Sequence, residues 1–389
     1  MRTNHRILFQ NSNHMHQIKD NSVDLMVTSP PYPMIQMWDE MFSEQNPKIK
    51  EALNNNGNLA FELMNQELDK VWNEVYRVLK EGGIACINIG DATRTFNGNF
   101  QIFPNSSRIV SHCSKLGFSC LPKILWRKTT NSPNKFMGSG MMPPGAYVTL
   151  EHEYILILRK GNKREFKTSK EKENRQESSY FWEERNIWFS DMWEGLNGVL
   201  QKLEDSNIRN RSAAYPFELA YRLINMFSVK GDIILDPYFG TGTTMLAAMS
   251  SGRNSIGIEI NPFFENTIKN RTKKIIEYSN KYIENRISKH LEFVNNRELK
   301  KGQLQYVNNH HGFKVMTKQE VFISFNHLSS IRNISSAEFE VTYLDKADKT
   351  KFSPSVDSQK AKIESNHENL NGLIETQIEN KNSVLTSFF

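Results

Sequence analysis

The sequence predicts an α/β fold in which helices cover both faces of one mostly parallel sheet. Short apolar runs without strict alternation are typical of strands buried on both faces, and helical patterns lie between these runs. A glycine-rich turn that joins one run to a helix is a second indication of such a sheet. The runs expected to form its seven strands are Ile7–Phe9, Val23–Val27, Ile84–Ile89, Ile124–Trp126, Tyr154–Leu158, Ile233–Leu235 and Ser255–Glu259.

Two of the intervening helices are predicted from apolar residues that recur every three or four positions. One stripe comprises Leu68, Val71, Val75 and Val78, and the segment from Phe217 to Phe227 repeats the pattern. A stripe of this kind lets a helix bury one side against a sheet.

The loop after the run Val23–Val27 is the first candidate site, because it reads Thr28-Ser29-Pro30-Pro31-Tyr32. Two prolines make this segment stiff and extended, so its carbonyls stay out of a helix. The Ser29 hydroxyl and the Pro30 carbonyl can accept both hydrogens of an exocyclic amine, while the Tyr32 ring offers a stacking face. These features indicate a nucleobase pocket. Taken alone, the motif equally fits a polyproline turn or a short linear ligand.

The second candidate site follows the run Ile233–Leu235. A glycine turn leads into a helix that begins at Thr243 and ends at Gly252. The next strand ends on Glu259, about 20 residues after the glycines, which is the spacing at which an acid binds ribose hydroxyls in nucleotide-binding βαβ units. The pattern predicts a nucleoside cofactor.

The identity of this cofactor follows by exclusion. A dinucleotide fingerprint needs a third small residue where Met245 stands, and a P-loop needs a lysine after Gly242, which is absent. S-adenosylmethionine carries no phosphate, approaches the backbone closely and needs an acid for its ribose. Gly240, Gly242 and Glu259 meet these needs, so we predict S-adenosylmethionine as the cofactor.

The two motifs in this order resemble those of the amino-group DNA methyltransferases, in particular the β arrangement, in which the Ser-Pro-Pro-Tyr motif precedes the cofactor motif. Further segments similar to that family are Leu79–Asp91, Ile124–Lys128, His152–Lys160 and Ser212–Leu219. The resemblance implies a Rossmann-like, S-adenosylmethionine-dependent methyltransferase sheet of seven strands with a permuted motif order, an inserted recognition region and a C-terminal extension.

The resemblance also implies roles for individual residues. The catalytic positions are Ser29, Pro30, Pro31 and Tyr32, and the cofactor-binding positions are Asn11, Ser212, Asp236, Phe239, Gly240, Gly242, Thr243 and Glu259. Asn11 stands where the family usually has an acid that meets the adenine amine, and its amide oxygen can still accept a hydrogen bond. In the family, serine at the first catalytic position mostly accompanies N4-cytosine methylation, and aspartate or asparagine mostly accompanies N6-adenine methylation. We therefore expect cytosine, with adenine as the alternative.

Charge favours a polyanionic partner, since the 389-residue chain has a formal charge of +6 and a pI near 9.0. Double-stranded DNA is the expected partner, with phosphate contacts at Lys123, Arg127, Lys128 and Lys135. A solvated lysine-rich loop is the alternative reading of this stretch. The resemblance further implies a partner restriction endonuclease.

The resemblance and changes in composition divide the chain into five parts. Residues 1–160 form the expected catalytic half, 161–208 the target-recognition region and 209–265 the cofactor-binding half. Residues 266–349 form a C-terminal extension, with a basic helix and β-like runs at Val321–Phe325 and Phe339–Leu344. The tail, 350–389, has few large apolar residues and is expected to be disordered.

Several function classes are disfavoured by what the sequence lacks. Methylation at the 5-carbon of cytosine needs a cysteine nucleophile, yet Cys86, Cys113 and Cys120 lie far from the Pro-Pro motif and read as core thiols. The histidines show no metal spacing, so no metal is expected, and His310-His311 is expected to face solvent.

No apolar run reaches about 18 residues, so we expect a cytoplasmic protein without a membrane segment, either monomeric or homodimeric. A noncatalytic DNA-binding protein on the same scaffold, or a methyltransferase acting on RNA or protein, remain alternatives.

Overall fold

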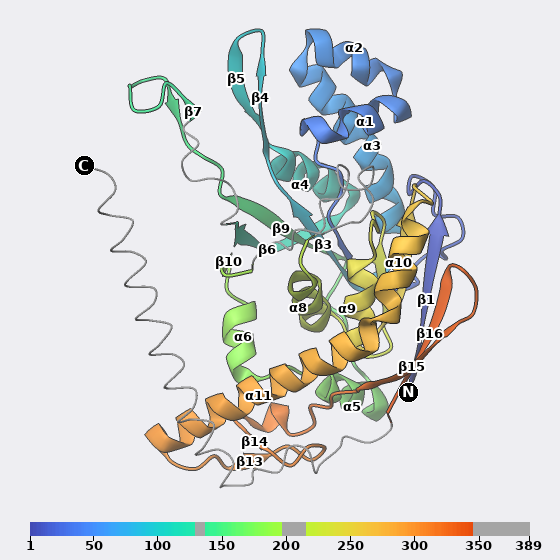
Figure 1. Ribbon diagram of the computed structural model, residues 1–389, viewed down its shortest axis with the longest axis vertical. Helices are drawn as coiled ribbons and strands as arrows, with labels where there is room; N and C mark the ends of the chain where they lie inside the picture. The colour runs from blue at the N-terminus through green and yellow to red at the C-terminus, as the bar shows by residue number, and fades with distance from the viewer. Residues whose placement is uncertain (129–136, 197–214, 345–389) are drawn as a thin grey trace.

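The computed structural model describes residues 1–128, 137–196 and 215–344 (Figure 1). Two predicted site residues, Lys135 and Ser212, lie outside the described residues. The same holds for the end of the predicted recognition region, 197–208, and for the predicted tail, 350–389.

The described residues contain one ten-stranded sheet in the order β10-β6-β9-β3-β2-β11-β12-β1-β16-β15. Its central strands, from β3 through β2, β11 and β12 to β1, are parallel. β9 is antiparallel to β3 and β6, β16 is antiparallel to β1 and β15, and the edge strand β10 is parallel to β6. The strands are β1 (Arg2–Phe9), β2 (Val23–Thr28), β3 (Leu79–Ile89), β6 (Phe118–Arg127), β9 (His152–Lys160), β10 (Met192–Trp193), β11 (Ile233–Asp236), β12 (Asn254–Glu259), β15 (Leu328–Asn333) and β16 (Glu338–Tyr343).

All seven strands predicted for the sheet belong to it, and it has three more, of which β10 and β15 were not predicted. The run Phe339–Leu344 coincides with β16, which pairs with β1, so part of the C-terminal segment extends the central sheet. The other run, Val321–Phe325, is not a strand. Its alternate residues Ile323 and Phe325 instead fill a small apolar cluster beneath α11.

Helices cover both faces of the sheet, as the two large cores show. In β2, Leu25 belongs to the core shared with α8 (Phe217–Phe227) and α9 (Thr243–Ser251), whereas Met26 belongs to the core shared with α3 (Gly57–Val78) and α4 (Asn105–Leu116). Adjacent residues of one strand therefore bury opposite sides, as the apolar runs predicted. The predicted helix starting at Thr243 is confirmed, with left-handed glycines at both of its ends.

The remaining elements lie around this core (Figure 1). Near its upper end are η1 (Gln36–Trp38), α1 (Asp39–Gln45), α2 (Pro47–Asn55) and the hairpins β4 (Ala92–Phe96) with β5 (Asn99–Phe103) and β7 (Met137–Gly138) with β8 (Ala146–Tyr147). The others are α5 (Ser169–Glu177), α6 (Trp182–Trp188), α10 (Phe264–Lys273), α11 (Ile275–Lys301), β13 (Tyr306–Val307), β14 (Lys314–Val315) and η2 (Lys318–Glu320).

The order of the strands creates a switch point between β2 and β11. These strands are parallel neighbours, with Leu25 opposite Ile234, and the chain leaves them in opposite directions, to β3 on one side and to β12 on the other. Open α/β sheets bind ligands beyond the carboxyl ends of their strands at such a point. The two loops singled out in the sequence both begin there, at Ser29 and at Pro237.

The first part of the predicted recognition region lies at the amino ends of the central strands, opposite the two candidate loops. Arg164 forms an ion pair with Asp232, just before β11, and Asn174 of α5 donates to the Lys230 carbonyl. In Figure 1, α5 lies at the lower end of the molecule, whereas the hairpins β4–β5 and β7–β8 project from the upper end. The segment from 161 to 177 is thus remote from the carboxyl ends of β2 and β11.

Candidate functional site

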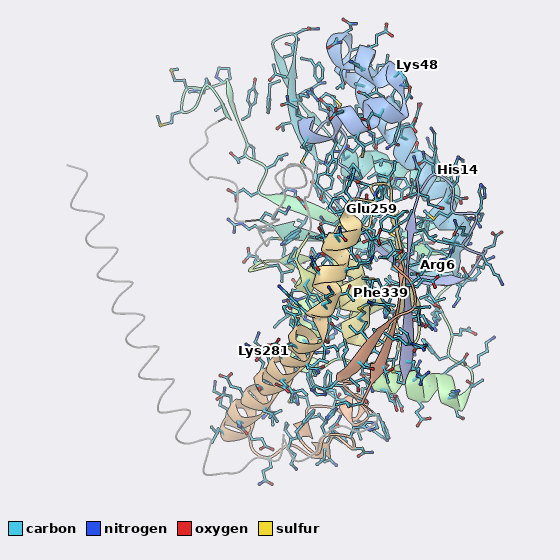
Figure 2. All side chains as sticks on the ribbon, turned by 45° about the vertical axis from the view of Figure 1, so that its right-hand side comes forward. Arg6, His14, Lys48, Glu259, Lys281 and Phe339 are labelled. Atoms are coloured by element: carbon cyan, nitrogen blue, oxygen red, sulfur yellow. The ribbon has the colours of Figure 1, made fainter. Side chains whose placement is uncertain are left out.

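One cavity of about 1000 Å³ opens at the switch point. Residues from both predicted loops line it: Ser29, Pro30, Pro31 and Tyr32 on one side, and Asp236, Phe239, Gly240, Thr243 and Glu259 on the other, with Asn11 from the loop after β1. Its volume is at the upper end of the range for small-molecule sites. Figure 2 shows Glu259 near the middle of the molecule, above Phe339.

The glycine loop leaves free space for a ligand. Gly240 has a φ of 53°, and among the described residues a Cβ at this position would meet no atom within 4 Å beyond its chain neighbours. Gly242 does not line the cavity; it begins α9 with a φ of 82°, and a Cβ there would come within 3.1 Å of the Phe239 ring. The two glycines therefore have different roles, since Gly240 permits a close approach and Gly242 permits the turn.

Glu259 closes this loop from the end of β12. Its carboxylate accepts from the Gly240 N–H at 2.7 Å and from the Asn261 N–H at 2.8 Å. Burial raises the pKa of Glu259, and these backbone hydrogen bonds oppose the rise. Each carboxylate oxygen keeps lone-pair capacity for a further donor, such as a ribose hydroxyl.

Asp236 connects the two loops. One of its oxygens accepts from Thr28 Oγ1 at 2.6 Å and the other accepts from Thr244 Oγ1 and from the Tyr215 hydroxyl. Burial raises the pKa of this carboxyl group, while its hydroxyl donors lower it. With these partners inside the protein, Asp236 holds the loops in register, and its predicted cofactor contact stays a prediction.

Two of the other predicted residues have local partners as well. The Asn11 side-chain oxygen accepts from the Asn13 N–H at 2.9 Å, which stabilises the turn after β1. Thr243 Oγ1 accepts from Arg271, which also donates to the Thr241 carbonyl at 2.7 Å. Arg271 comes from α10 and supports the glycine loop from behind, and its basic character was the only sign of this role in the sequence.

The catalytic loop carries a chain of polar contacts. Ser29 Oγ lies 3.1 Å from the Tyr32 hydroxyl, which donates to Glu153 Oε2 at 2.9 Å. Asn88 Nδ2 donates to the same carboxylate oxygen at 2.7 Å and to the Tyr32 oxygen at 2.8 Å, and Lys128 Nζ donates to Glu153 Oε1. All of these side chains line the large cavity. Neither Glu153 nor Asn88 was predicted from the sequence as a site residue.

One buried acceptor indicates that this region can receive a bound partner. Asn88 Oδ1 is buried and has no hydrogen-bond partner in the described part of the chain, so an acceptor remains unsatisfied at the cavity wall. Gly90 leaves room for the Tyr32 ring, because a Cβ at Gly90 would lie 3.1 Å from it. Burial, and then the charge of Glu153, raise the pKa of Tyr32 well above its usual value, so its hydroxyl stays protonated.

The predicted DNA-binding cations have different surroundings. Lys128 lines the cavity and pairs with Glu153, whereas Arg127 lies outside it and pairs with Glu151 and Glu194, both at 3.3 Å. Lys123 is exposed and stacks over the Tyr154 ring at 4.7 Å. Phosphate binding at these positions stays a prediction, and for Arg127 it would compete with two carboxylates.

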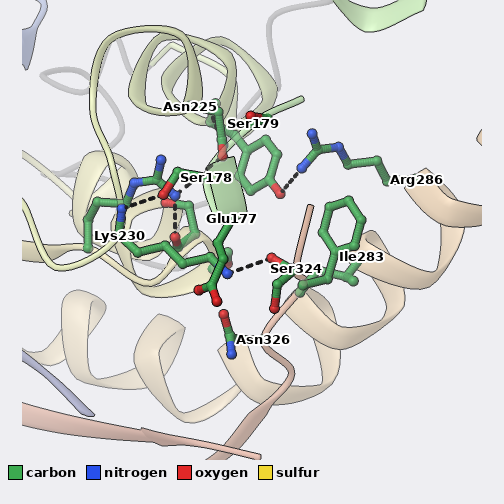
Figure 3. A pocket seen from close by; sticks show the side chains of 14 residues that line it. Glu177, Ser178, Ser179, Asn225, Lys230, Ile283, Arg286, Ser324 and Asn326 are labelled. Atoms are coloured by element: carbon green, nitrogen blue, oxygen red, sulfur yellow. Dashed lines mark hydrogen bonds between the residues drawn. The ribbon is translucent and has the colours of Figure 1, made fainter. Parts of the chain in front are cut away.

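A second cavity, of about 20 Å³, is lined by residues of α8 and α11, among them Asn225 and Arg286 (Figure 3). Lys230 Nζ donates there to the Ser324 carbonyl at 2.6 Å, and burial lowers the pKa of Lys230 to about 7. This space is enough for one water molecule and too small for a cofactor. The large cavity is therefore the candidate site.

Some other predictions are corrected or completed by the structure. His311 is buried, contrary to the expectation that His310-His311 faces solvent, because its ring packs against Phe313. Cys86 and Cys113 are buried as expected, but Cys120 is exposed.

Across residues 1–128, 137–196 and 215–344, no group of three or more His, Cys, Asp or Glu side chains is arranged to hold a metal ion, and no helix is long and apolar enough to cross a membrane.

Comparison with known proteins identifies the family. A model of the DNA methylase family, which groups N6 and N4 methylases, matches residues 23–270. The chain belongs to this family. The match contains the catalytic and glycine loops of the cavity and every strand from β2 to β12.

Individual relatives of this DNA methylase agree. It is 51% identical over 345 residues to the type II methyltransferase M.MthZI of Methanothermobacter thermautotrophicus, covering 88% of this chain and 96% of that protein. It is 49% identical to M.MjaI of Methanocaldococcus jannaschii, covering 70% and 94%. Among solved structures it resembles a DNA modification methylase of Thermus thermophilus in complex with S-adenosyl-L-methionine, with 32% identity, a TM-score of 0.54 and coverage of 70% and 95%. The Rossmann-like methyltransferase fold predicted from the sequence is thereby confirmed.

Proposed function

We propose that this methylase transfers a methyl group from S-adenosylmethionine to the N4 amine of a cytosine that is flipped out of duplex DNA. The observation that carries the proposal is the shared cavity, in which an amine-accepting Ser-Pro-Pro-Tyr loop faces a glycine loop closed by Glu259. The family match and the relatives named type II methyltransferases support the reaction class.

The cofactor fits the residues present. Gly240 leaves open space beside the backbone, and Glu259 retains acceptor capacity next to it. Bound at this end of the cavity, S-adenosylmethionine would supply an electrophilic methyl group. Ser29 and the Pro30 carbonyl accept the two amine hydrogens and aim the nitrogen lone pair, and Tyr32 stacks on the base. Most of the rate gain then comes from positioning.

Extrusion of the base is required because its amine is otherwise buried in pairing. We propose that the duplex lies against the upper end of the molecule, from which the hairpins β4–β5 and β7–β8 project (Figure 1). Phe100 and Tyr147 stack with ring centres 4.4 Å apart and so join the two hairpins. The target-recognition role predicted for 161–208 then falls to its later part, because the segment that contains α5 lies at the opposite edge.

Cytosine is the proposed target because serine occupies the first catalytic position, and serine there mostly accompanies N4-cytosine methylation. The second candidate is N6-adenine methylation, since the family model includes both amines. The relatives are named type II methyltransferases, which supports a role in restriction and modification beside a cognate endonuclease. We further propose that the protein acts in the cytoplasm, as a monomer or homodimer.

The reaction class is tested by incubating the full-length protein with S-adenosylmethionine labelled on its methyl group and with duplex DNA, RNA or bulk protein in parallel. We expect label on duplex DNA alone. Label on RNA or protein would contradict the DNA assignment, and cofactor binding without transfer to any substrate would favour a noncatalytic DNA-binding protein.

A further inference from the structure

The Ser29 hydroxyl needs a definite orientation for the proposed reaction, because it must accept a hydrogen from the target amine. A free serine hydroxyl rotates and can either donate or accept. Which of the two it does here depends on its neighbours, Tyr32 and Asn88, and on the groups behind them.

Glu153 fixes the direction of every hydrogen bond in this group. An ionised carboxylate only accepts, so Tyr32, 2.9 Å away, donates its single hydroxyl hydrogen to Glu153. The Tyr32 oxygen is then an acceptor toward Ser29 Oγ at 3.1 Å, and Ser29 must donate to it. Ser29 Oγ then has two lone pairs to offer, of which one faces Asn88 Nδ2 at 3.4 Å and the other is left for the proposed target amine.

Asn88 and Lys128 keep this arrangement in place. Asn88 Nδ2 donates to both Glu153 and Tyr32. Both contacts need an acceptor, which the Glu153 carboxylate and the Tyr32 oxygen supply. Lys128 pairs with the other oxygen of Glu153, whose side chain is only 12% exposed, and so compensates a carboxylate with little access to water.

We propose that Glu153 is a positioning residue that orients the relay Ser29–Tyr32–Glu153 and accepts the proton released on methyl transfer. This deepens the proposed function and rests on it. The amine nitrogen forms a bond to the methyl carbon while the carbon–sulfur bond breaks and its electron pair stays on sulfur. The nitrogen then loses one proton to Ser29 Oγ, the Ser29 proton moves to Tyr32, and the Tyr32 proton moves to the Glu153 carboxylate.

The proton on Glu153 can leave to solvent through the cavity, because Glu153 itself lines the cavity wall. The Lys128 ammonium cannot accept this proton, but its charge beside Glu153, on a side chain that is 29% exposed, favours return of Glu153 to the carboxylate. Because burial and the Glu153 charge raise the pKa of Tyr32, its hydroxyl relays a proton without becoming a stable phenolate. No separate base beside the target amine is needed.

The decisive variant is Glu153→Gln, which keeps the shape but can donate to Tyr32 and so reverse the relay. We expect the single-turnover rate of methyl transfer to fall on the order of 10²-fold at saturating DNA and cofactor. The dissociation constant for S-adenosylmethionine should change less than twofold. Glu151→Gln is the matched control, because the Glu151 side chain pairs with Arg127 and with no residue of the relay; its rate should equal that of the wild type.

A double-mutant comparison separates positioning from general damage. If Glu153 acts through Ser29, then Glu153→Gln should add no further loss to Ser29→Ala, and the same should hold in a Tyr32→Phe background. Additive losses would overturn the proposal, as would a normal rate for Glu153→Gln. If the wild type itself transfers no methyl group to DNA, the proposed function fails instead, so the two failures are distinguishable. If Glu153→Gln does not bind the cofactor, Tyr32→Phe alone decides: an unchanged rate would overturn the relay.

Discussion

At the residue scale, the site depends on acceptors whose direction is set by neighbours distant in the sequence. Ser29 and Tyr32 belong to one loop, but Asn88 comes from β3 and Glu153 from β9, which are antiparallel neighbours in the sheet. The Ser-Pro-Pro-Tyr motif predicted the loop and its amine chemistry. Glu153 and Asn88 were missed because a single polar residue within a strand gives no sign of what it faces.

Replacing Ser29 by alanine removes one acceptor for the target amine. We expect the methyl-transfer rate to fall by roughly 10²-fold, by analogy with the loss of one transition-state hydrogen bond. Binding of S-adenosylmethionine should be unchanged, since Ser29 lies on the catalytic side of the cavity. Rapid-quench kinetics and calorimetric titration measure the two quantities, and an unchanged rate would show that Ser29 has no part in transfer.

Replacing Gly240 by aspartate should remove cofactor binding. The new side chain would occupy the open space beside the loop and place a carboxylate near Glu259, where its charge is unfavourable. We expect the dissociation constant for S-adenosylmethionine to rise at least about tenfold, which is about 1.4 kcal/mol. Gly231→Asp is the matched control, because that glycine also has a positive φ and open space but lies before β11 and outside the cavity. Equal affinity in both variants would contradict the placement of the cofactor.

At the element scale, the buried strands were predictable and the edge strands were not. The seven predicted strands are apolar because helices cover both of their faces, and this signal is independent of their neighbours. By contrast, β15 is largely exposed and β10 has only two residues, so neither leaves an apolar run. The strand-like run at Val321–Phe325 was a wrong prediction. Its residues are apolar because they pack in a cluster around α11 and not because they belong to a strand.

The hairpin β7–β8 should contribute to DNA binding. Its tip exposes Met141 (86%) and Met142 (69%), and the hairpin projects from the upper end of the molecule (Figure 1). Apolar side chains of this kind insert between base steps in proteins that distort a duplex. Replacing both methionines by serine should weaken duplex binding severalfold without affecting cofactor affinity.

The matched control for this hairpin lies on α5, at the opposite edge of the sheet. Replacing Lys170 and Lys172 there by glutamine should leave duplex affinity within about twofold, when both variants are compared by fluorescence anisotropy at one salt concentration. A larger loss from the α5 variant than from the hairpin variant would reverse the proposed orientation of the DNA.

At the scale of the whole molecule, segments from both ends of the described chain build one sheet. β1 pairs with β12 on one side and with β16 on the other, so residues 2–9 lie between strands that come from position 254 onward. The two motifs are far apart in the sequence, but the strands that precede them, β2 and β11, are neighbours in the sheet. The sequence predicted the parts of this sheet, but the pairing of β1 with β16 depends on contacts between the two ends that no local pattern reveals.

The free energy of unfolding should depend on pH through Lys230, which lies at the lower end of the molecule. Burial lowers the pKa of Lys230 to about 7, below its value in the unfolded chain, so the unfolded state binds more protons between about pH 7 and 10. Lys230 therefore makes the free energy of unfolding rise with pH across this window, by at most about 1.4 kcal/mol per pH unit. Urea unfolding of wild type and Lys230→Met should show the variant losing stability relative to wild type as the pH rises. A constant difference would contradict the burial of an uncharged amine.

The most direct test of the central claim is to identify the methylated base. The purified protein is incubated with labelled S-adenosylmethionine and varied duplex DNA, and the DNA is digested to nucleosides for mass spectrometry. N4-methylcytosine is the predicted product. N6-methyladenine would keep the amine-accepting site but contradict the target inferred from Ser29, and an absence of label on any DNA would contradict the account of the cavity as a site of methyl transfer.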